Sequence, residues 1–128
     1  MPKKIILALL VAAVLIGLYK FISKPTGTPV ADDTKANLIL FVGNGCPHCK
    51  NVEDFIKANN IDSKLVISQK EVYYNQINQK LLNDTVKNCP KIDTSQGIGV
   101  PLAYIKDTQT CLQGDTPIID YLKTKAGI

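Results

Sequence analysis

Two cysteines separated by two residues, between an apolar run and a helix-forming segment, constrain this chain more than any other feature. Leu38–Val42 is a short apolar run, typical of a strand that is buried on both faces. Residues 43–45 are glycine-rich and interrupt the run, and Cys46-Pro47-His48-Cys49 follows directly. Because proline suits the first turn of a helix, the pattern predicts a strand, a tight loop and a helix with the cysteine pair at its start.

The segments after the motif alternate between helical and strand patterns. Val52, Phe55 and Ile56 lie on one face of the first helix, which two asparagines at 59–60 should end. Residues 65–67 predict a second apolar strand. Residues 68–71 fit a capping box, which predicts a long helix ending at Cys89-Pro90. Its apolar positions would be Tyr73, Ile77, Leu81, Leu82 and Val86.

The C-terminal third predicts a hairpin and a last helix. Residues 102–105 and 110–112 read as strands joined by a turn at 106–109, and residues 117–123 read as a helix capped by Asp115 or Thr116. The order β-α-β-α-β-β-α predicts an α/β domain in which about three helices flank a four-stranded mixed sheet.

The first 22 residues differ from the rest of the chain. Residues 5–19 are an unbroken apolar run after Lys3 and Lys4, and continuing through Lys20 to Ile22 gives eighteen residues. This favours a single N-terminal transmembrane helix or signal anchor at 1–22, a linker at 23–35 and a folded domain at 36–128. A cleaved signal peptide and a buried helix are the alternatives. With the disulfide chemistry below, we expect a membrane-anchored protein whose domain lies on the extracytoplasmic, periplasmic side.

The charge pattern argues against nucleic-acid binding. The formal net charge is +4, but four lysines lie in or beside the N-terminal run, and eleven lysines balance eleven acidic residues from Ala31 onward. The chain has no arginine, the residue that contacts guanine and phosphate in a bidentate manner.

The position of Cys46-Pro47-His48-Cys49 suggests redox chemistry. A thiol at a helix N-terminus has a lowered pKa, because the unpaired N–H groups and the helix dipole favour its thiolate. Cys46 would then attack, Cys49 would resolve the mixed disulfide, and Pro47 and His48 would tune the balance towards a disulfide donor. The alternatives are half of a zinc site, a purely structural disulfide, and a non-enzymatic domain that carries metal or docks a partner.

Val100-Pro101 stands directly before an apolar strand. A cis bond here would turn the backbone of Val100 towards the cysteine pair, where it could pair with an extended substrate segment. The alternative is a trans proline that starts an edge strand.

With these pieces, the chain resembles the thioredoxin-like superfamily over about residues 38–123. The dipeptide Pro47-His48 is that of DsbA-type disulfide oxidases, in which the pKa of the first cysteine is strongly lowered, whereas the short domain and the segment Gly99-Val100-Pro101 are more similar to glutaredoxins. The resemblance implies a thiol–disulfide oxidoreductase that acts on protein thiols, needs no cofactor besides its cysteine pair, and is re-oxidised by a quinone-linked membrane oxidase of the DsbB or vitamin-K-epoxide-reductase-like type.

The chain departs from this family pattern at two places. Leu40 stands where thioredoxin and DsbA carry a buried acid, and Gln113-Gly114 replaces the glycine pair that precedes the glutathione-binding acid of glutaredoxins. A reductase or isomerase therefore remains the alternative to an oxidase.

Cys89 and Cys111 remain if Cys46 pairs with Cys49. A structural disulfide between them would close a loop around Pro101 and contribute roughly 3 kcal/mol. A second redox-active pair and two free buried thiols are the alternatives.

Overall fold

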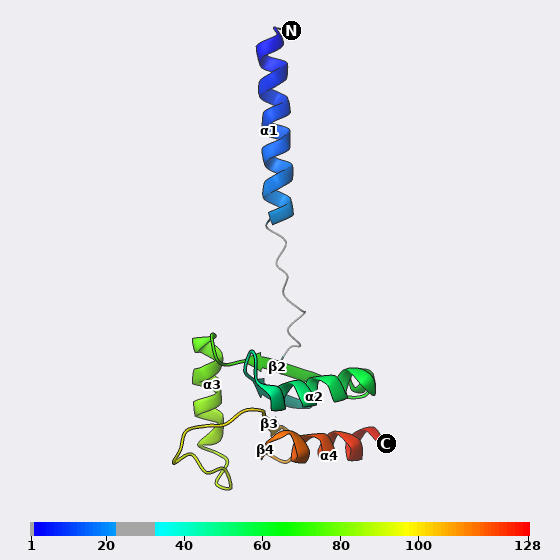
Figure 1. The fold of residues 1–128 in the computed structure, drawn as a ribbon, viewed down its shortest axis with the longest axis vertical. Helices are drawn as coiled ribbons and strands as arrows, with labels where there is room; N and C mark the ends of the chain where they lie inside the picture. The colour runs from blue at the N-terminus through cyan, green and yellow to red at the C-terminus, as the bar shows by residue number, and fades with distance from the viewer. Residues whose placement is uncertain (1, 23–32) are drawn as a thin grey trace.

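The computed structural model describes residues 2–22 and 33–128 and contains one mixed sheet with helices on both faces (Figure 1). The helices are α1 (Lys3–Ile22), α2 (Pro47–Ala58), α3 (Gln76–Val86) and α4 (Asp115–Ala126). The strands are β1 (Leu38–Val42), β2 (Ile67–Glu71), β3 (Leu102–Ile105) and β4 (Thr110–Gln113). A short 3₁₀ turn, η1, covers Ile61–Ser63.

The N-terminal helix does not fit the predicted membrane span. No helix among the described residues combines the length and the apolar character that crossing a bilayer requires. The unbroken apolar run 5–19 rises only about 22 Å as a helix, against about 30 Å of bilayer hydrocarbon, and the longer count depended on including Lys20. The predicted transmembrane helix is therefore wrong, and with it the predicted membrane-anchored localisation. Most of the predicted linker, residues 23–32, lies outside the described residues.

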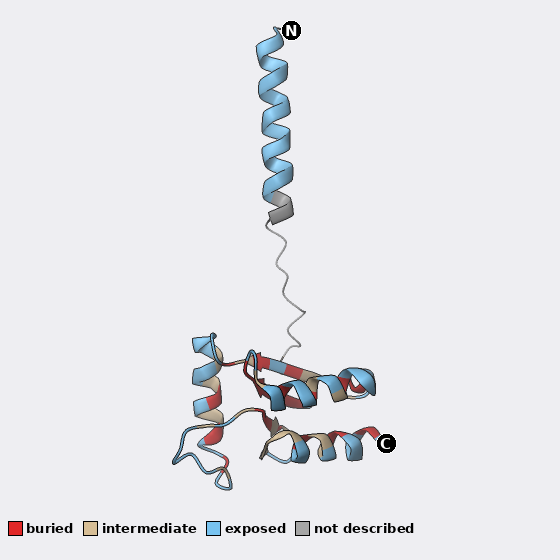
Figure 2. Ribbon diagram, viewed as in Figure 1, coloured by how far each residue is buried: buried red, intermediate tan, exposed pale blue. Residues whose placement is uncertain are grey.

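Strand β1 occupies an inner position in the sheet, whose order is β2-β1-β3-β4. It pairs parallel with β2 and antiparallel with β3, and β3 pairs antiparallel with β4. All five residues of β1 are buried, as expected for a strand covered on both faces. Figure 2 shows buried residues along the sheet and an exposed α1. The α/β class and the four-stranded mixed sheet were predicted correctly, and the topology is compatible with a thioredoxin-like fold.

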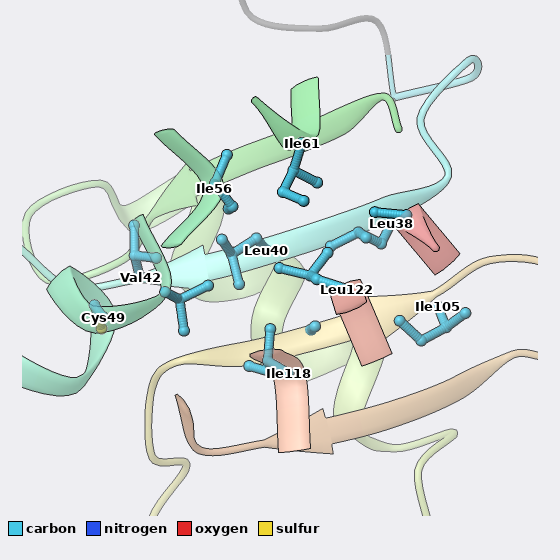
Figure 3. Close-up of a cluster of buried hydrophobic side chains, with 12 residues drawn as sticks. Leu38, Leu40, Val42, Cys49, Ile56, Ile61, Ile105, Ile118 and Leu122 are labelled. Atoms are coloured by element: carbon cyan, nitrogen blue, oxygen red, sulfur yellow. The ribbon is translucent and has the colours of Figure 1, made fainter. Parts of the chain in front are cut away.

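Alternate residues of β1 belong to two different cores. Leu38, Leu40 and Val42 face α2 and α4, where Ile56, Ile118 and Leu122 pack against them (Figure 3). Ile39 and Phe41 face the other side, where α3 covers them. The period-two alternation thus gives each face of the same strand its own helical layer. The first core also buries Cys49 and so holds the start of α2 on the sheet.

The second strand and the third helix lie later in the chain than the sequence predicted. The supposed capping box at 68–71 is part of β2, where Ser68 and Lys70 are buried and their neighbours are not. Lys70 pairs with Asp33 at 2.9 Å, and Ser68 also donates to Asp33, so polar partners permit burial of this face.

Helix α3 begins at Gln76, after the Asn75 side chain accepts a hydrogen bond from the Asn78 N–H. Tyr73 precedes the helix, and Ile77 is 82% exposed, so neither belongs to the predicted apolar face. Leu82 and Val86 are buried as predicted, and the helix ends at Val86, before Cys89.

The last helix is longer than predicted. It begins at Asp115, directly after Gly114, whose φ of 92° lies in the region that favours glycine. This start brings the side chain of Asp115 to the same end of the domain as the start of α2.

Candidate functional site

Cys46 and Cys49 form a disulfide at the N-terminus of α2, with 5.3 Å between their Cα atoms. Cys46 is the N-cap of the helix, and its Sγ accepts a hydrogen bond from the Cys49 N–H at 3.1 Å. Cys46 is partly exposed, whereas Cys49 is only 1% exposed. The two sulfurs thus differ in access: an incoming thiolate can reach the first more readily than the second.

The loop before the cysteines is held by hydrogen bonds and by one close aromatic contact. The Cys46 N–H donates to the Gly43 carbonyl at 3.1 Å, and the Gly43 N–H lies 3.5 Å from Cys49 Sγ. The ring of Tyr73 lies so close over Gly43 that an added Cβ would come within 2.3 Å of it. A side chain at position 43 would therefore have to displace the Tyr73 ring.

Glu71, at the end of β2, supports the same loop. Its carboxylate accepts hydrogen bonds from the backbone N–H groups of Asn44, Tyr73 and Tyr74. Burial tends to raise the pKa of Glu71, but the hydrogen bonds from Tyr74, Tyr73 and Asn44 outweigh it and lower that pKa. The ionised carboxylate thus ties the loop at 43–45 to the segment that carries the two tyrosines.

Val100 and Pro101 lie beside the cysteine pair, as the sequence suggested. The bond between them is cis, and the Val100 carbonyl oxygen lies 3.7 Å from Cys46 Sγ. The Pro101 carbonyl accepts from the Gly114 N–H at 2.9 Å, and the Gln113 side chain donates to the Gly99 carbonyl at 3.1 Å. The segment that contains the predicted substrate-binding residues is thus tied to the end of β4 and to the residue that caps α4.

His48 points to a partner that the sequence did not identify. Its Nδ1 lies 3.0 Å from Asp115 Oδ2, and the Asn51 side chain donates to the same oxygen at 2.7 Å. These hydrogen bonds from Asn51 and His48 lower the pKa of the Asp115 carboxyl to about 2. The sequence pattern marks Asp115 only as a helix cap or by its glutaredoxin-like position, and Asn51 not at all. The spacing of His48 and Asn51, three residues apart on a helix, was the available signal.

One hollow adjoins the cysteine pair, and a second adjoins Val100. One, of about 670 Å³, reaches Cys46 and Pro47 and is bounded by the charged side chains of Lys50 and Glu71 and by Tyr74. The other, of about 590 Å³, lies between α3 and the loop at 94–100 and is lined in part by Val72, Leu82, Val86, Ile98 and Val100. Polar side chains, among them Gln79 and Lys87, also line this hollow, and Val100 lies both in its wall and beside the Cys46 sulfur.

Cys89 and Cys111 form a second disulfide, which joins the segment after α3 to β4. Cys89 is 3% exposed, and Cys111 is partly buried against the core that contains Ile39 and Phe41. The predicted pairing is thus present, away from any helix N-terminus. Its structural role stays a prediction.

Leu40, at the position where thioredoxin and DsbA carry a buried acid, is fully buried. Among the described residues, the buried polar side chains are Ser68 and Lys70, so no buried carboxylate lies in the core beside Cys49. The described part of the chain also has no group of three or more histidine, cysteine or acidic residues arranged to hold a metal ion.

Comparison of the chain with family models, with curated proteins and with solved structures finds no match.

Proposed function

We propose that this protein is a thiol–disulfide oxidoreductase that donates the Cys46–Cys49 disulfide to protein thiols. The observation that carries the proposal is the environment of Cys46: a partly exposed, disulfide-bonded sulfur that caps α2 and accepts the Cys49 N–H at 3.1 Å. A structural disulfide has no need for this placement, whereas a leaving thiolate is stabilised by it.

The exchange proceeds in two displacements. A substrate thiolate attacks Cys46 Sγ, the Cys46–Cys49 bond breaks, and the electron pair goes to Cys49, which takes up a proton. A second substrate thiolate then attacks the substrate sulfur that is bonded to Cys46 in the mixed disulfide. Cys46 leaves as a thiolate. The substrate leaves with a disulfide, and the protein keeps two electrons as a reduced pair.

The direction follows from which form the site stabilises. In the reduced protein, the N-terminal N–H groups of α2 would face the Cys46 thiolate. Stabilising the reduced form makes the disulfide form the stronger oxidant. We therefore assign the protein as a disulfide donor, with a quinone-linked oxidase of the DsbB or vitamin-K-epoxide-reductase-like type as the proposed source of oxidising equivalents.

The proposed substrate is an extended polypeptide segment next to a cysteine. Such a segment would pair with the backbone of Val100, whose carbonyl oxygen lies 3.7 Å from Cys46 Sγ. Its apolar side chains would enter the hollow between α3 and the loop at 94–100.

One observation favours a second candidate, a reductase or isomerase. Leu40 supplies no proton acceptor beside Cys49, as in glutaredoxin-like sequences. The two candidates predict opposite directions of electron flow at neutral pH, so a reduction potential separates them.

The test uses the full chain with a peptide that contains two cysteines and with oxidised glutathione to regenerate the disulfide. Wild type should oxidise the peptide catalytically, and Cys46→Ser should reduce the rate to the uncatalysed background. Cys49→Ser, which lacks the second sulfur, should accumulate a mixed disulfide between Cys46 and glutathione, formed as the Cys46 thiolate attacks oxidised glutathione and releases one reduced glutathione, and mass spectrometry detects it. The double variant C89S/C111S, which leaves the first pair intact, is the matched control. A Cys46→Ser variant as active as wild type would rule out the proposal.

A further inference from the structure

Asp115 receives more hydrogen bonds at the site than its place as a helix-terminal residue requires. Its Oδ2 lies 3.0 Å from His48 Nδ1 and 2.7 Å from Asn51 Nδ2, and its Oδ1 accepts the Thr116 N–H at 3.0 Å. Its side chain is 22% exposed, against 70% for that of His48. The carboxylate is thus held from α2 and from α4 at once, while the imidazole keeps one side in solvent.

This geometry determines which imidazole nitrogen carries the proton. The hydrogen bonds from Asn51 and His48 lower the pKa of Asp115 to about 2, so the carboxylate is ionised near neutral pH and can only accept hydrogen bonds. Nδ1 must therefore be the donor in this contact. In the neutral ring, Nε2 then has no proton and presents a lone pair.

We propose that Asp115, together with Asn51, is a positioning residue that holds His48 as the Nδ1–H tautomer, with Nε2 as proton acceptor for the incoming substrate thiol. The inference rests on the proposed function and assigns a base to its first step. The substrate S–H bond breaks, its proton goes to Nε2, and the sulfur forms the bond to Cys46 as the Cys46–Cys49 bond breaks. The imidazolium later returns this proton to solvent.

The neighbouring charged side chains have other partners, so His48 is the candidate proton acceptor. On α2, Lys50 pairs with Asp54 at 2.7 Å, and Glu53 accepts a hydrogen bond from Gln69 of β2. Asp115 is the charged group of α4 that contacts the ring. No buried carboxylate occurs among the described residues, because the buried polar side chains there are Ser68 and Lys70. A base for the substrate thiol is thus available at the exposed end of α2.

The first test reads the tautomer directly. The chain contains one histidine, so the ring nitrogens of ¹⁵N-histidine-labelled full-length protein give unambiguous NMR signals. We expect the neutral ring to show a protonated Nδ1 and an unprotonated Nε2 in wild type and in Asp120→Ala, a control on the same helix whose carboxylate pairs with Lys123. Asp115→Ala should lose this preference. A protonated Nε2 in the neutral ring of wild type would overturn the proposal.

The second test measures the rate of peptide oxidation by the oxidised protein. Asp115→Ala should slow it roughly tenfold at neutral pH, below the ~10²–10⁴-fold of a fully positioned base because His48 is solvent-exposed. It should also change the pH profile, whereas Asp120→Ala should match wild type. In a His48→Ala background, Asp115→Ala should cause no further loss.

An unchanged rate in Asp115→Ala, or an equal loss with and without His48, would contradict the positioning role. A wild-type protein that oxidises no peptide would instead contradict the proposed function itself.

Discussion

The two disulfides of this chain occupy contrasting environments. Cys46–Cys49 spans three positions, caps a helix N-terminus and has a partly exposed first sulfur. Cys89–Cys111 spans 22 positions, joins two separate elements and has a 3% exposed first cysteine. The first lies where charge on sulfur is stabilised, and the second lies beside a hydrophobic core. Loop length, access and local field thus lead us to propose redox chemistry for the first pair and a stabilising role for the second.

The largest expected difference is in activity. Cys46→Ser should abolish oxidation of a dithiol peptide, whereas C89S/C111S should stay within a few-fold of wild type, because in the proposed exchange only the first pair reacts with substrate. Peptide oxidation followed by mass spectrometry checks both. Loss of activity in C89S/C111S, with the fold intact by circular dichroism, would show that the contrast is false.

For the free energy of unfolding, loss of the second disulfide should matter more than loss of the first. Removing Cys89–Cys111 should lower the free energy of unfolding by about 3 kcal/mol, because a loop across 22 positions is freed in the unfolded chain. C46S/C49S, which frees a much shorter loop, should lose less. Denaturant unfolding of both double variants measures the difference. An equal or greater loss in C46S/C49S would contradict the assignment.

Much of this contrast could be predicted from sequence. The strand at Leu38–Val42, the helix start at Pro47 and the hairpin depend on local signals, namely apolar runs, proline and turn residues, and the structure confirms them. The capping-box pattern at 68–71 misled because Ser68 and Lys70 face inward and bond to Asp33, a contact across the chain that local pattern does not show.

The residues of the candidate site also include some that local sequence predicts and some that it does not. Cys46, Cys49 and Val100 follow from motif and spacing. The contact between His48 and Asp115 joins residues 67 positions apart and depends on how α4 lies beside α2, which the sequence does not specify. The predicted transmembrane helix at the N-terminus was wrong for a different reason. The apolar length of the run is close to the minimum for a membrane span, and counting through Lys20 overstated it.

A smaller effect is expected in the loop beside the first pair. Gly43→Ala should destabilise the protein by about 1 kcal/mol, at the low end for overpacking, because the new Cβ would displace the half-exposed ring of Tyr73. The double variant G43A/Y73A should recover most of this loss. Urea unfolding of the single and double variants tests the contact, and additive losses would show that ring and glycine are not coupled.

The smallest expected effect is a loss of stability at low pH. The pKa of Asp115 is lowered from 3.8 to about 2, so its contribution to stability is present above about pH 4 and is lost as the pH falls towards 2. The groups that line the surface at Cys89–Cys111 include no carboxylate. Between pH 4 and 2, the melting temperature of wild type should therefore approach that of Asp115→Ala. A constant gap between the two would show that the carboxylate does not titrate with folding.

The most direct test is the reduction potential of each pair, measured in the full chain by equilibration in thiol buffers of graded potential, differential alkylation and mass spectrometry. For Cys46–Cys49 we predict a value near about −120 mV, the oxidising end of the known range, and for Cys89–Cys111 a value below about −300 mV. A value of about −230 mV or lower for Cys46–Cys49 would contradict the assignment as a disulfide donor.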